Sequence, residues 1–193
     1  CSKDATGEIT VPEGVLSVAD EAFYECANIT SVTLPYGVSS IGKDAFYKCE
    51  NLSDIILPDS LTSIGAWSFC NCKNLMQVTI PDSVTKIGGC AFQHCTKLEY
   101  IDIPNSVTEI GTTVFYECDS LTSVTIPDSV TSLDTYIFYE CDNLSSVTIG
   151  NGVTSIPTGT FKDCQSLAQV TLGENITRIE QIAFENCKNL ISI

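Results

Sequence analysis

Hydrophobic residues recur along this chain with a period of 23 residues. The phenylalanines show the period most clearly, because all eight occupy one position of the repeat: Phe23, Phe46, Phe69, Phe92, Phe115, Phe138, Phe161 and Phe184. A cysteine follows each of them three residues later, at Cys26, Cys49, Cys72, Cys95, Cys118, Cys141, Cys164 and Cys187. A period without insertions predicts a solenoid, in which each repeat forms one turn and neighbouring turns share a continuous core.

Polar and apolar positions within one repeat predict short extended elements rather than helices. Ile55 and Leu57 alternate with outward-facing positions, which predicts a strand. The sequence Pro-Asp-Ser at 58–60 consists of residues that favour turns, and it predicts the end of that strand. A shorter second strand is expected around Ile64, followed by a tight bend at Gly65 and then a turn or short 3₁₀ segment.

Strands at the same position of consecutive repeats must run parallel and in register, so we expect one long sheet. The late repeats replace the bend glycine by Asp134, Pro157 and Glu180. Their apolar spacing is retained, so we expect the turns to persist there as well.

The repeat also sets the domain organisation. Residues 1–8 are polar and do not match it, so we interpret them as an N-terminal flank. Residues 9–193 are predicted to form one domain of about eight repeats. Because Ile193 is a core strand position without the polar cap that a solenoid end requires, we expect the domain to be truncated and further repeats or another domain to follow in the parent protein.

Eight of the 11 cysteines share one repeat position, which argues against disulfides. Such residues stack one turn apart at about 4.8 Å, whereas a disulfide needs Cβ atoms about 3.8 Å apart. A linear ladder also does not converge on a point, as zinc ligands must. We therefore predict buried free thiols that pack as small hydrophobes. Cys70 and Cys90 lie off the ladder and could approach each other across adjacent turns, but we expect no bond between them.

The formal net charge is −15, from 24 acidic and 9 basic residues. This balance argues against nucleic acid and against an anionic membrane surface as partners, and it favours a partner with basic patches. No apolar run approaches the ~18 residues of a transmembrane helix, so we expect no direct membrane insertion. The chain begins at Cys1, followed by Ser2 and a polar stretch. One hypothesis is that Cys1 carries the lipid of a bacterial lipoprotein, and the alternative is an arbitrary boundary.

The unit Leu-x-x-Val-x-Ile-Pro-x-x-Val-x-x-Ile-Gly-x-x-Ala-Phe-x-x-Cys resembles the 23-residue leucine-rich repeat of the Treponema pallidum/BspA type. Residues 98–118 match it well, with Val114 where the family usually has alanine, and the resemblance covers residues 9–193. It implies a leucine-rich-repeat solenoid of the α/β horseshoe class that is predominantly β, with short second strands and 3₁₀ or turn segments opposite the sheet. It also implies a surface-exposed protein of oral or gut bacteria or of parasitic protists. Several such proteins are adhesins, and the family has no catalytic residues to transfer.

Candidate chemistry is sparse. His94 precedes Cys95, but that cysteine belongs to the predicted buried ladder, so His94 is interpreted as a solvated loop residue. Neither a phosphate-binding glycine loop nor a calcium loop is present. We therefore expect no enzymatic activity, no cofactor and no metal.

Acidic residues line the loop around the cysteine position in three successive turns, and Glu50 extends this stripe earlier in the chain. The stripe could hold cations or a basic peptide, although a solvated edge is favoured. Its members in the three turns are Glu117, Asp119, Glu140, Asp142 and Asp163.

Most outward strand positions carry Ser or Thr, and the departures cluster in three adjacent strands. An exposed Ile, Met and Tyr among carboxylates have the composition of a recognition patch, although ordinary divergence between repeats explains them equally well. We therefore predict an adhesin-like binding module, on the cell surface or secreted, that recognises a host or microbial protein or glycan through the sheet face. The alternative is a structural spacer that projects another domain. The candidate binding residues are Asp54, Ile56, Met76, Gln77, Glu99, Tyr100 and Asp102.

Overall fold

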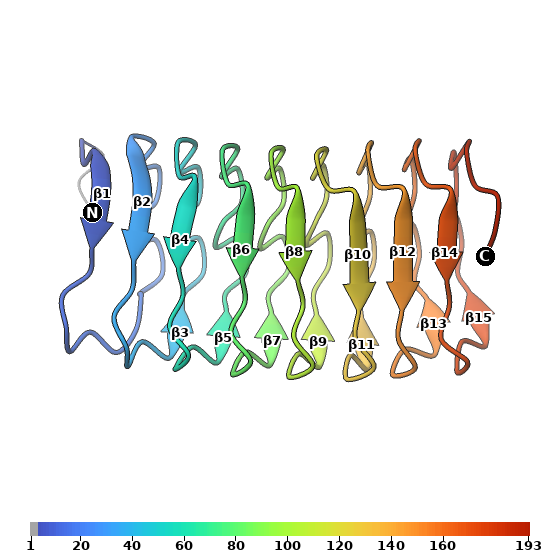
Figure 1. The fold of residues 1–193 in the computed structure, drawn as a ribbon, viewed down its shortest axis with the longest axis horizontal. Coiled ribbons are helices and arrows are strands. Elements are labelled where there is room, and N and C mark those ends of the chain that lie inside the picture. Colours follow the sequence, from blue (N-terminus) through green and yellow to red (C-terminus); the bar gives the residue numbers. More distant parts are fainter. Residues whose placement is uncertain (1–3) are drawn as a thin grey trace.

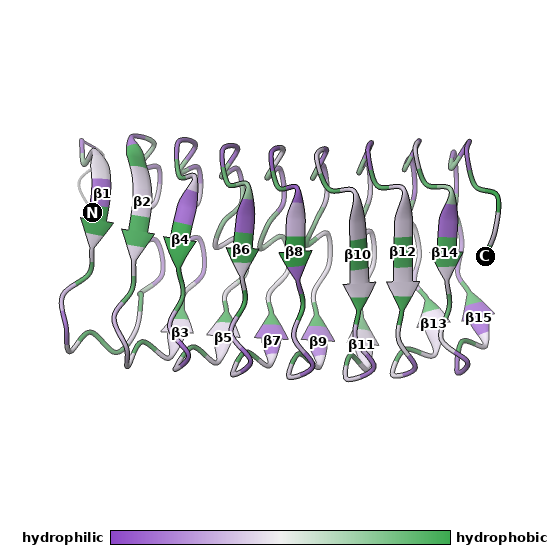
Figure 2. Cartoon of the chain, viewed as in Figure 1, coloured by the Kyte–Doolittle hydropathy of each residue, from purple (hydrophilic) through white to green (hydrophobic). Residues whose placement is uncertain are grey.

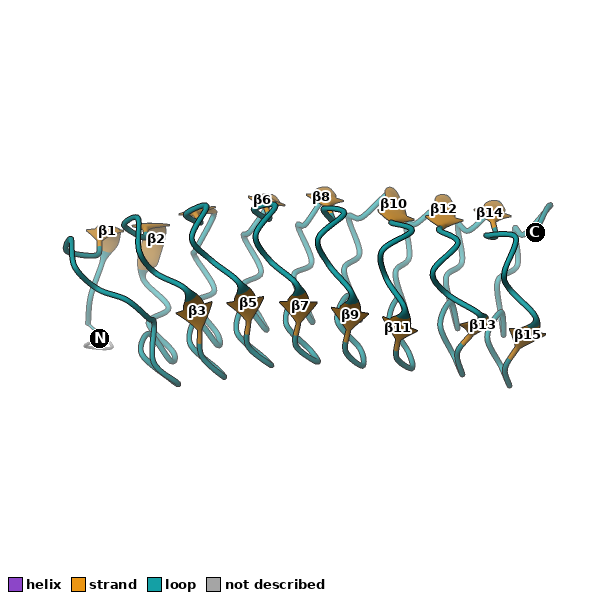
Figure 3. Cartoon of the chain, turned by 90° about the horizontal axis from the view of Figure 1, so that it is seen from below, coloured by secondary structure: helices purple, strands orange, loops and turns teal. Residues whose placement is uncertain are grey.

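The computed structural model describes residues 4–193 as an elongated solenoid whose turns stack side by side (Figure 1). The strands follow one another along the stack in chain order, from β1 at one end to β14 and β15 at the other. Figure 3 shows the longer strands along one edge of each turn and the two-residue strands along another, with loops and turns between them. No helix occurs within residues 4–193, so the predicted β solenoid is confirmed.

The longer strands form the first sheet and the two-residue strands form the second. The first sheet contains β1 (Gly7–Thr10), β2 (Ile29–Thr33), β4 (Asp54–Ile56), β6 (Gln77–Thr79), β8 (Tyr100–Asp102), β10 (Ser123–Ile126), β12 (Ser146–Ile149) and β14 (Gln169–Thr171). The second sheet contains β3 (Ser40–Ile41), β5 (Ser63–Ile64), β7 (Lys86–Ile87), β9 (Glu109–Ile110), β11 (Ser132–Leu133), β13 (Ser155–Ile156) and β15 (Arg178–Ile179). Figure 2 shows a hydrophobic band across the first sheet, where the inward-facing residues lie, with hydrophilic positions beside it in several strands.

Strand pairing is parallel and in register, as predicted: Val124 pairs with Val147, and Val147 with Val170. The expectation of one continuous sheet is wrong, however. The first sheet consists of three ladders, β1-β2-β4, β6-β8 and β10-β12-β14. No ladder joins β4 to β6 or β8 to β10, although these strands remain adjacent in the stack (Figure 1).

The second sheet is also interrupted, between β11 and β13, and Pro157 explains the break. In most turns the residue after the short strand donates its N–H to the turn before it. The Gly111 N–H, for example, lies 3.0 Å from the Ile87 oxygen. Pro157 occupies this repeat position and has no N–H to donate. The turn persists, as expected, but its ladder bond is lost.

A column of phenylalanine rings fills the core along the whole solenoid. Neighbouring rings are stacked, with centroids 4.9 Å apart at Phe23–Phe46 and 5.9 Å apart at Phe92–Phe115. The six inner rings are fully buried, whereas Phe23 and Phe184 are partly buried. Each turn therefore depends on its neighbours for burial, which is the cooperative principle of a solenoid.

The cysteine ladder is buried beside this column. All ten cysteines of residues 4–193 are free thiols, nine are buried, and Cys187 is half-buried. The structure adds a role that the sequence did not indicate. From Cys49 onward, each ladder thiol donates a hydrogen bond to a phenylalanine carbonyl of the preceding turn, such as Cys118 Sγ to the Phe92 oxygen at 3.2 Å. Each of these carbonyls also accepts the backbone N–H of the ladder cysteine in its own turn, so the thiol supplies a second hydrogen bond as well as filling space.

Successive β-turns replace the 3₁₀ segment considered as one alternative. The residues two before and two after Phe46, Asp44 and Lys48, have positive φ of 55° and 56°. A 3₁₀-helix requires a run of right-handed residues, so left-handed residues at this spacing prevent one. The same position accommodates the bulky Trp67 at φ 60°, which is an uncommon conformation for such a residue.

Gly65 is required for a different reason from the one expected. Its φ is not positive, but a Cβ atom there would lie 2.6 Å from the carbonyl carbon of Gly42. The bend glycines therefore permit close approach between successive turns.

Candidate functional site

The first sheet presents the predicted binding residues on its outer face. Ile55, Val78 and Ile101 point into the core at the centres of β4, β6 and β8, so the flanking residues point outward. All seven candidates are exposed, and the apolar side chains of Ile56, Met76 and Tyr100 are 54%, 49% and 56% exposed. We call these seven residues the sheet-face patch: Asp54, Ile56, Met76, Gln77, Glu99, Tyr100 and Asp102.

Two hollows lie on this face, and they share Glu99 and Tyr100. Five members of the patch line the first hollow; Ile56 and Asp102 do not, because they lie at the other ends of their strands. The first hollow is lined by Ser53, Asp54, Met76, Gln77, Glu99 and Tyr100, and the second by Glu99, Tyr100, Ser120, Thr122 and Asn143. Sequence reasoning missed Ser53, Ser120, Thr122 and Asn143, because each is an ordinary polar residue for its repeat position.

The charge of the patch is negative. Among the described residues, no ion pair engages its carboxylates Asp54, Glu99 and Asp102. Lysines in the same turns have other partners: Lys73 pairs with Glu50, Lys86 with Glu109, and Lys97 donates to Asn74. A cationic partner would therefore meet carboxylates without an internal counter-ion.

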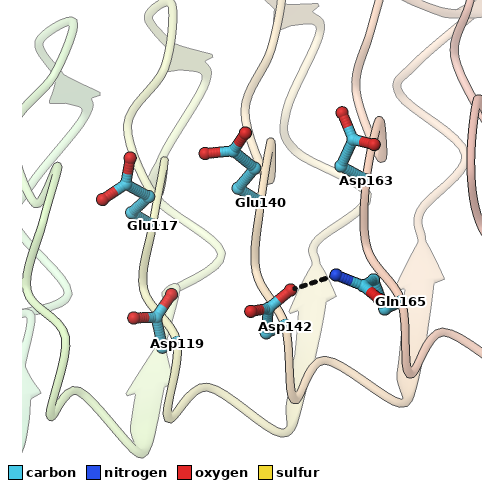
Figure 4. Close-up of a pocket in the computed structure, with 6 residues that line it drawn as sticks. All are labelled: Glu117, Asp119, Glu140, Asp142, Asp163 and Gln165. Carbon is cyan, nitrogen blue, oxygen red and sulfur yellow. Dashed lines mark hydrogen bonds between the residues drawn. The ribbon is translucent and has the colours of Figure 1, made fainter.

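The acidic stripe forms a second candidate, and Figure 4 shows it as two rows that run across three turns, with one residue of each row from each turn. The upper row contains Glu117, Glu140 and Asp163, and the lower row contains Asp119 and Asp142 and continues with Gln165. Gln165 Nε2 lies 3.4 Å from Asp142 Oδ1. All five predicted acidic residues therefore line one hollow, whereas Glu50 pairs with Lys73 elsewhere.

Neighbouring groups shift the pKa values of the stripe carboxyls in both directions. Burial raises the pKa of Asp119, and the negative charges of Asp142 and Glu117 raise it further. Burial acts in the same direction on Glu117, but a hydrogen bond from Tyr116 and the nearby His94 outweigh it, so the Glu117 pKa is lowered. A hydrogen bond from Asn186, with further help from Lys162, lowers the pKa of Asp163. Among the described residues, no group of three or more His, Cys, Asp or Glu side chains could hold a metal ion.

His94 is not simply solvated, as the sequence suggested. Its Nδ1 lies 2.9 Å from Glu117 Oε2 and its Nε2 lies 3.0 Å from Gln93 Nε2. Its ring also lies at a tilt beside Tyr116. These contacts tie successive turns together and account for the side chain structurally.

Buried thiols do not form a reactive centre in this fold. Burial raises the pKa of Cys49 to about 12 and holds that of Cys72 well above its usual value. A nucleophilic cysteine needs the opposite shift. Cys70 and Cys90 are both free and buried. The predicted lipid site at Cys1 lies outside the described residues.

The architecture defines a class of protein: a parallel β solenoid built from leucine-rich repeats. The BspA type leucine rich repeat region matches residues 2–118 and 68–191, in six copies. The chain therefore belongs to the BspA-type leucine-rich-repeat family.

Solved structures agree with this assignment. The leucine-rich-repeat protein of Treponema pallidum is 31% identical, with a TM-score of 0.69 over 95% of this chain and 78% of that one. A leucine-rich cell surface protein from Faecalibacterium prausnitzii is 29% identical, with a TM-score of 0.51 over 91% of this chain and 62% of that one. The pneumococcal vaccine antigen PcpA shares the fold at 19% identity, with a TM-score of 0.61 over 97% of this chain and 65% of that one.

No curated protein sequence matches this chain significantly. Residues 4–193 contain no helix that is long and apolar enough to cross a bilayer.

Proposed function

We propose that this chain is an adhesin-like binding module, on the cell surface or secreted, that recognises a protein or glycan through the sheet-face patch. The observation that carries the proposal is the concentration of exposed Ile56, Met76 and Tyr100 on, or immediately before, three adjacent strands. Ser and Thr at outward strand positions are soluble and compatible with β geometry. Replacing them with large apolar side chains exposes hydrophobic area without adding to the core, which is typical of an interaction surface.

Relatives support the location. The Faecalibacterium prausnitzii protein is described as a cell surface protein, and the pneumococcal protein as a vaccine antigen. An anchoring lipid on Cys1 remains a separate hypothesis, which an upstream sequence without a signal peptide and lipidation motif would contradict.

The alternative function is a spacer whose solenoid projects another domain. The two proposals differ in one measurable property, because a binding module has a saturable ligand and a spacer has none. We would screen the immobilised protein against purified extracellular-matrix proteins and a glycan array. Saturable binding to at least one purified ligand is expected, whereas its absence across both panels would favour the spacer.

The site is then tested with variants of the patch. Tyr100→Ala should weaken binding of that ligand by about tenfold or more, because buried interface tyrosines are frequent hot spots. Asp102→Ala should also weaken it. Ser123→Ala and Thr148→Ala, on outward positions of β10 and β12, serve as matched controls and should leave affinity unchanged. Unchanged affinity for the patch variants, with loss in Glu117→Ala or Glu140→Ala, would place the site at the acidic stripe instead.

A further inference from the structure

The two hollows on the first sheet lie next to each other along the solenoid axis. They share Glu99 and Tyr100 as lining residues and follow one another from β4 past β6 and β8 towards β10, and we call the two hollows together the trough. Its course is perpendicular to the strands. An elongated ligand in the trough would therefore run parallel to the axis and contact successive turns.

The trough coincides with the two breaks in the first sheet, where backbone hydrogen bonds are missing. Just before the strand, the Ser53 N–H donates to the Thr30 oxygen at 2.9 Å and the Glu99 N–H donates to the Met76 oxygen at 3.0 Å. Within the described part of the chain, the equivalent N–H groups of Met76 and Thr122 make no such bond. Both residues are exposed.

At this repeat position, each break therefore leaves a donor and an acceptor without the backbone bond that the other turns make. At the first hollow these are the Met76 N–H and the Ser53 carbonyl, and at the second they are the Thr122 N–H and the Glu99 carbonyl. A paired donor and acceptor is what the main chain of another polypeptide can satisfy.

The spacing of the two pairs fits an extended chain. The pairs lie two turns apart, or about 10 Å at the usual strand spacing of about 4.8 Å. The ring centroids of the core are 5.4 and 5.9 Å apart in these turns, which is consistent with slightly wider separation. In a β-strand, residues three apart face opposite sides. A polyproline II segment, an extended conformation with three residues per turn and a rise of about 3.1 Å per residue, instead returns every third residue to an equivalent position about 9.3 Å further on.

We propose that the trough binds an extended basic segment of a partner polypeptide, a conclusion that rests on the proposed function and specifies its ligand. The main chain of the segment bonds to the open backbone groups at the two breaks. Its Arg or Lys side chains pair with Asp54 and Glu99, and an apolar side chain packs on Tyr100. The absence of an internal counter-ion for these carboxylates favours a cationic ligand over a neutral glycan.

Amide hydrogen exchange followed by NMR tests the backbone part of the proposal. In the free protein, the Met76 and Thr122 amides should exchange much faster than those of Ser53, Glu99 and Ser145, whose N–H groups are bonded. Equal protection of Met76 and Ser145 in the free protein would overturn the proposal, because the open groups would not exist.

Binding is tested with labelled peptides of about twelve residues that carry arginine at every third position, a length that spans the trough when extended. Controls are a peptide of the same composition with contiguous arginines and one with glutamate in place of arginine. Fluorescence anisotropy should show saturable binding of the spaced peptide, weakened by salt, with little binding of the acidic one. Binding should slow exchange at Met76 and Thr122.

Variants locate the bound peptide. Tyr100→Ala and the pair Asp54→Asn with Glu99→Gln should each raise the Kd of the spaced peptide about tenfold or more, whereas Thr148→Ala and Glu140→Gln should leave it unchanged. Loss of binding in Glu140→Gln alone would overturn the proposal by placing cationic peptides at the acidic stripe. If Tyr100→Ala abolishes binding of a glycan while no basic peptide binds, this inference fails and the proposed function stands. If a ligand binds without any effect of the patch variants, the proposed site fails as well.

Discussion

Native thiols of the cysteine ladder should react with alkylating reagents far more slowly than ordinary cysteines. Only the thiolate is nucleophilic, and burial, with a contribution from Cys26, raises the pKa of Cys49 to about 12. At pH 8 a thiol with a pKa of about 8.5 is roughly one quarter thiolate, whereas a pKa of about 12 leaves roughly one part in ten thousand. The expected suppression is therefore about a thousandfold, before any steric protection is added.

The assay is a pulse of iodoacetamide on the native protein at pH 8, followed by denaturation without reductant, a second isotopic label and peptide mapping. Cys187 should label first, because it is half-buried and burial raises its pKa only to about 11. Raising the pH by one unit should increase every slow rate about tenfold, since the thiolate fraction rises in proportion. The denatured protein should yield at least eight free thiols.

Two outcomes would refute this reasoning. Native labelling of Cys72 or Cys95 as fast as that of Cys187, with the fold intact by circular dichroism, would contradict the burial of the ladder. Four or more disulfides in the denatured, non-reduced protein would contradict the ladder itself. Survival of free thiols matters for a surface or secreted protein, because that environment oxidises accessible cysteines.

Three further predictions concern stability, measured by chemical or thermal unfolding. Phe92→Ala should lower the free energy of unfolding by about 3–5 kcal/mol, because its ring is fully buried and stacked on both sides. Phe184→Ala should lower it less, because its ring is partly buried and stacked on one side. Equal losses of stability would contradict the stacked core. Ser68→Ala should be neutral or stabilising by up to about 1–2 kcal/mol, because Ser68 Oγ is buried without a hydrogen-bond partner in the described chain. Thr160→Val, at the same repeat position, should destabilise the protein by about 1 kcal/mol, because it removes a 2.8 Å hydrogen bond to the backbone. A comparable loss of stability in both variants would show that Ser68 has a partner. Asp119→Asn should raise the unfolding midpoint slightly at pH 7. The pKa of Asp119 is raised in the folded protein, so its ionised form destabilises the fold at pH values above that pKa, and the gain from the variant should vanish below the ordinary aspartate pKa. A gain that persists at low pH would exclude charge as the cause.

Repeat spacing alone was sufficient to predict the stacked architecture, because every turn repeats the same contacts. The phenylalanine column, the alternation of strand residues and the burial of the cysteines follow directly from a period of 23 residues. β alternation also predicted that five of the seven patch residues face outward, and all five are exposed. The other two, Met76 and Glu99, precede their strands and are exposed as well. These features depend on local periodicity, which a sequence displays without knowledge of distant contacts.

Contacts between turns, in contrast, were decided by the tertiary structure. The thiol-to-carbonyl bonds depend on which peptide plane faces which side chain across 26 positions of sequence, and no residue pattern indicates that orientation. Gly65 is needed because the backbone of Gly42 lies against it, and not because of its own φ. The ladder break at Pro157 could have been anticipated from its missing N–H, but only once the partner in the preceding turn was known.

The trough illustrates the same division. The sequence showed that Met76 and Glu99 depart from the usual Ser or Thr of their repeat position. It could not show that the ladder opens beside them, because a backbone hydrogen bond is lost through small changes in the separation of two turns. Residue types therefore determined where the surface differs from the repeat, and the stacking of the turns determined which backbone groups remain open there.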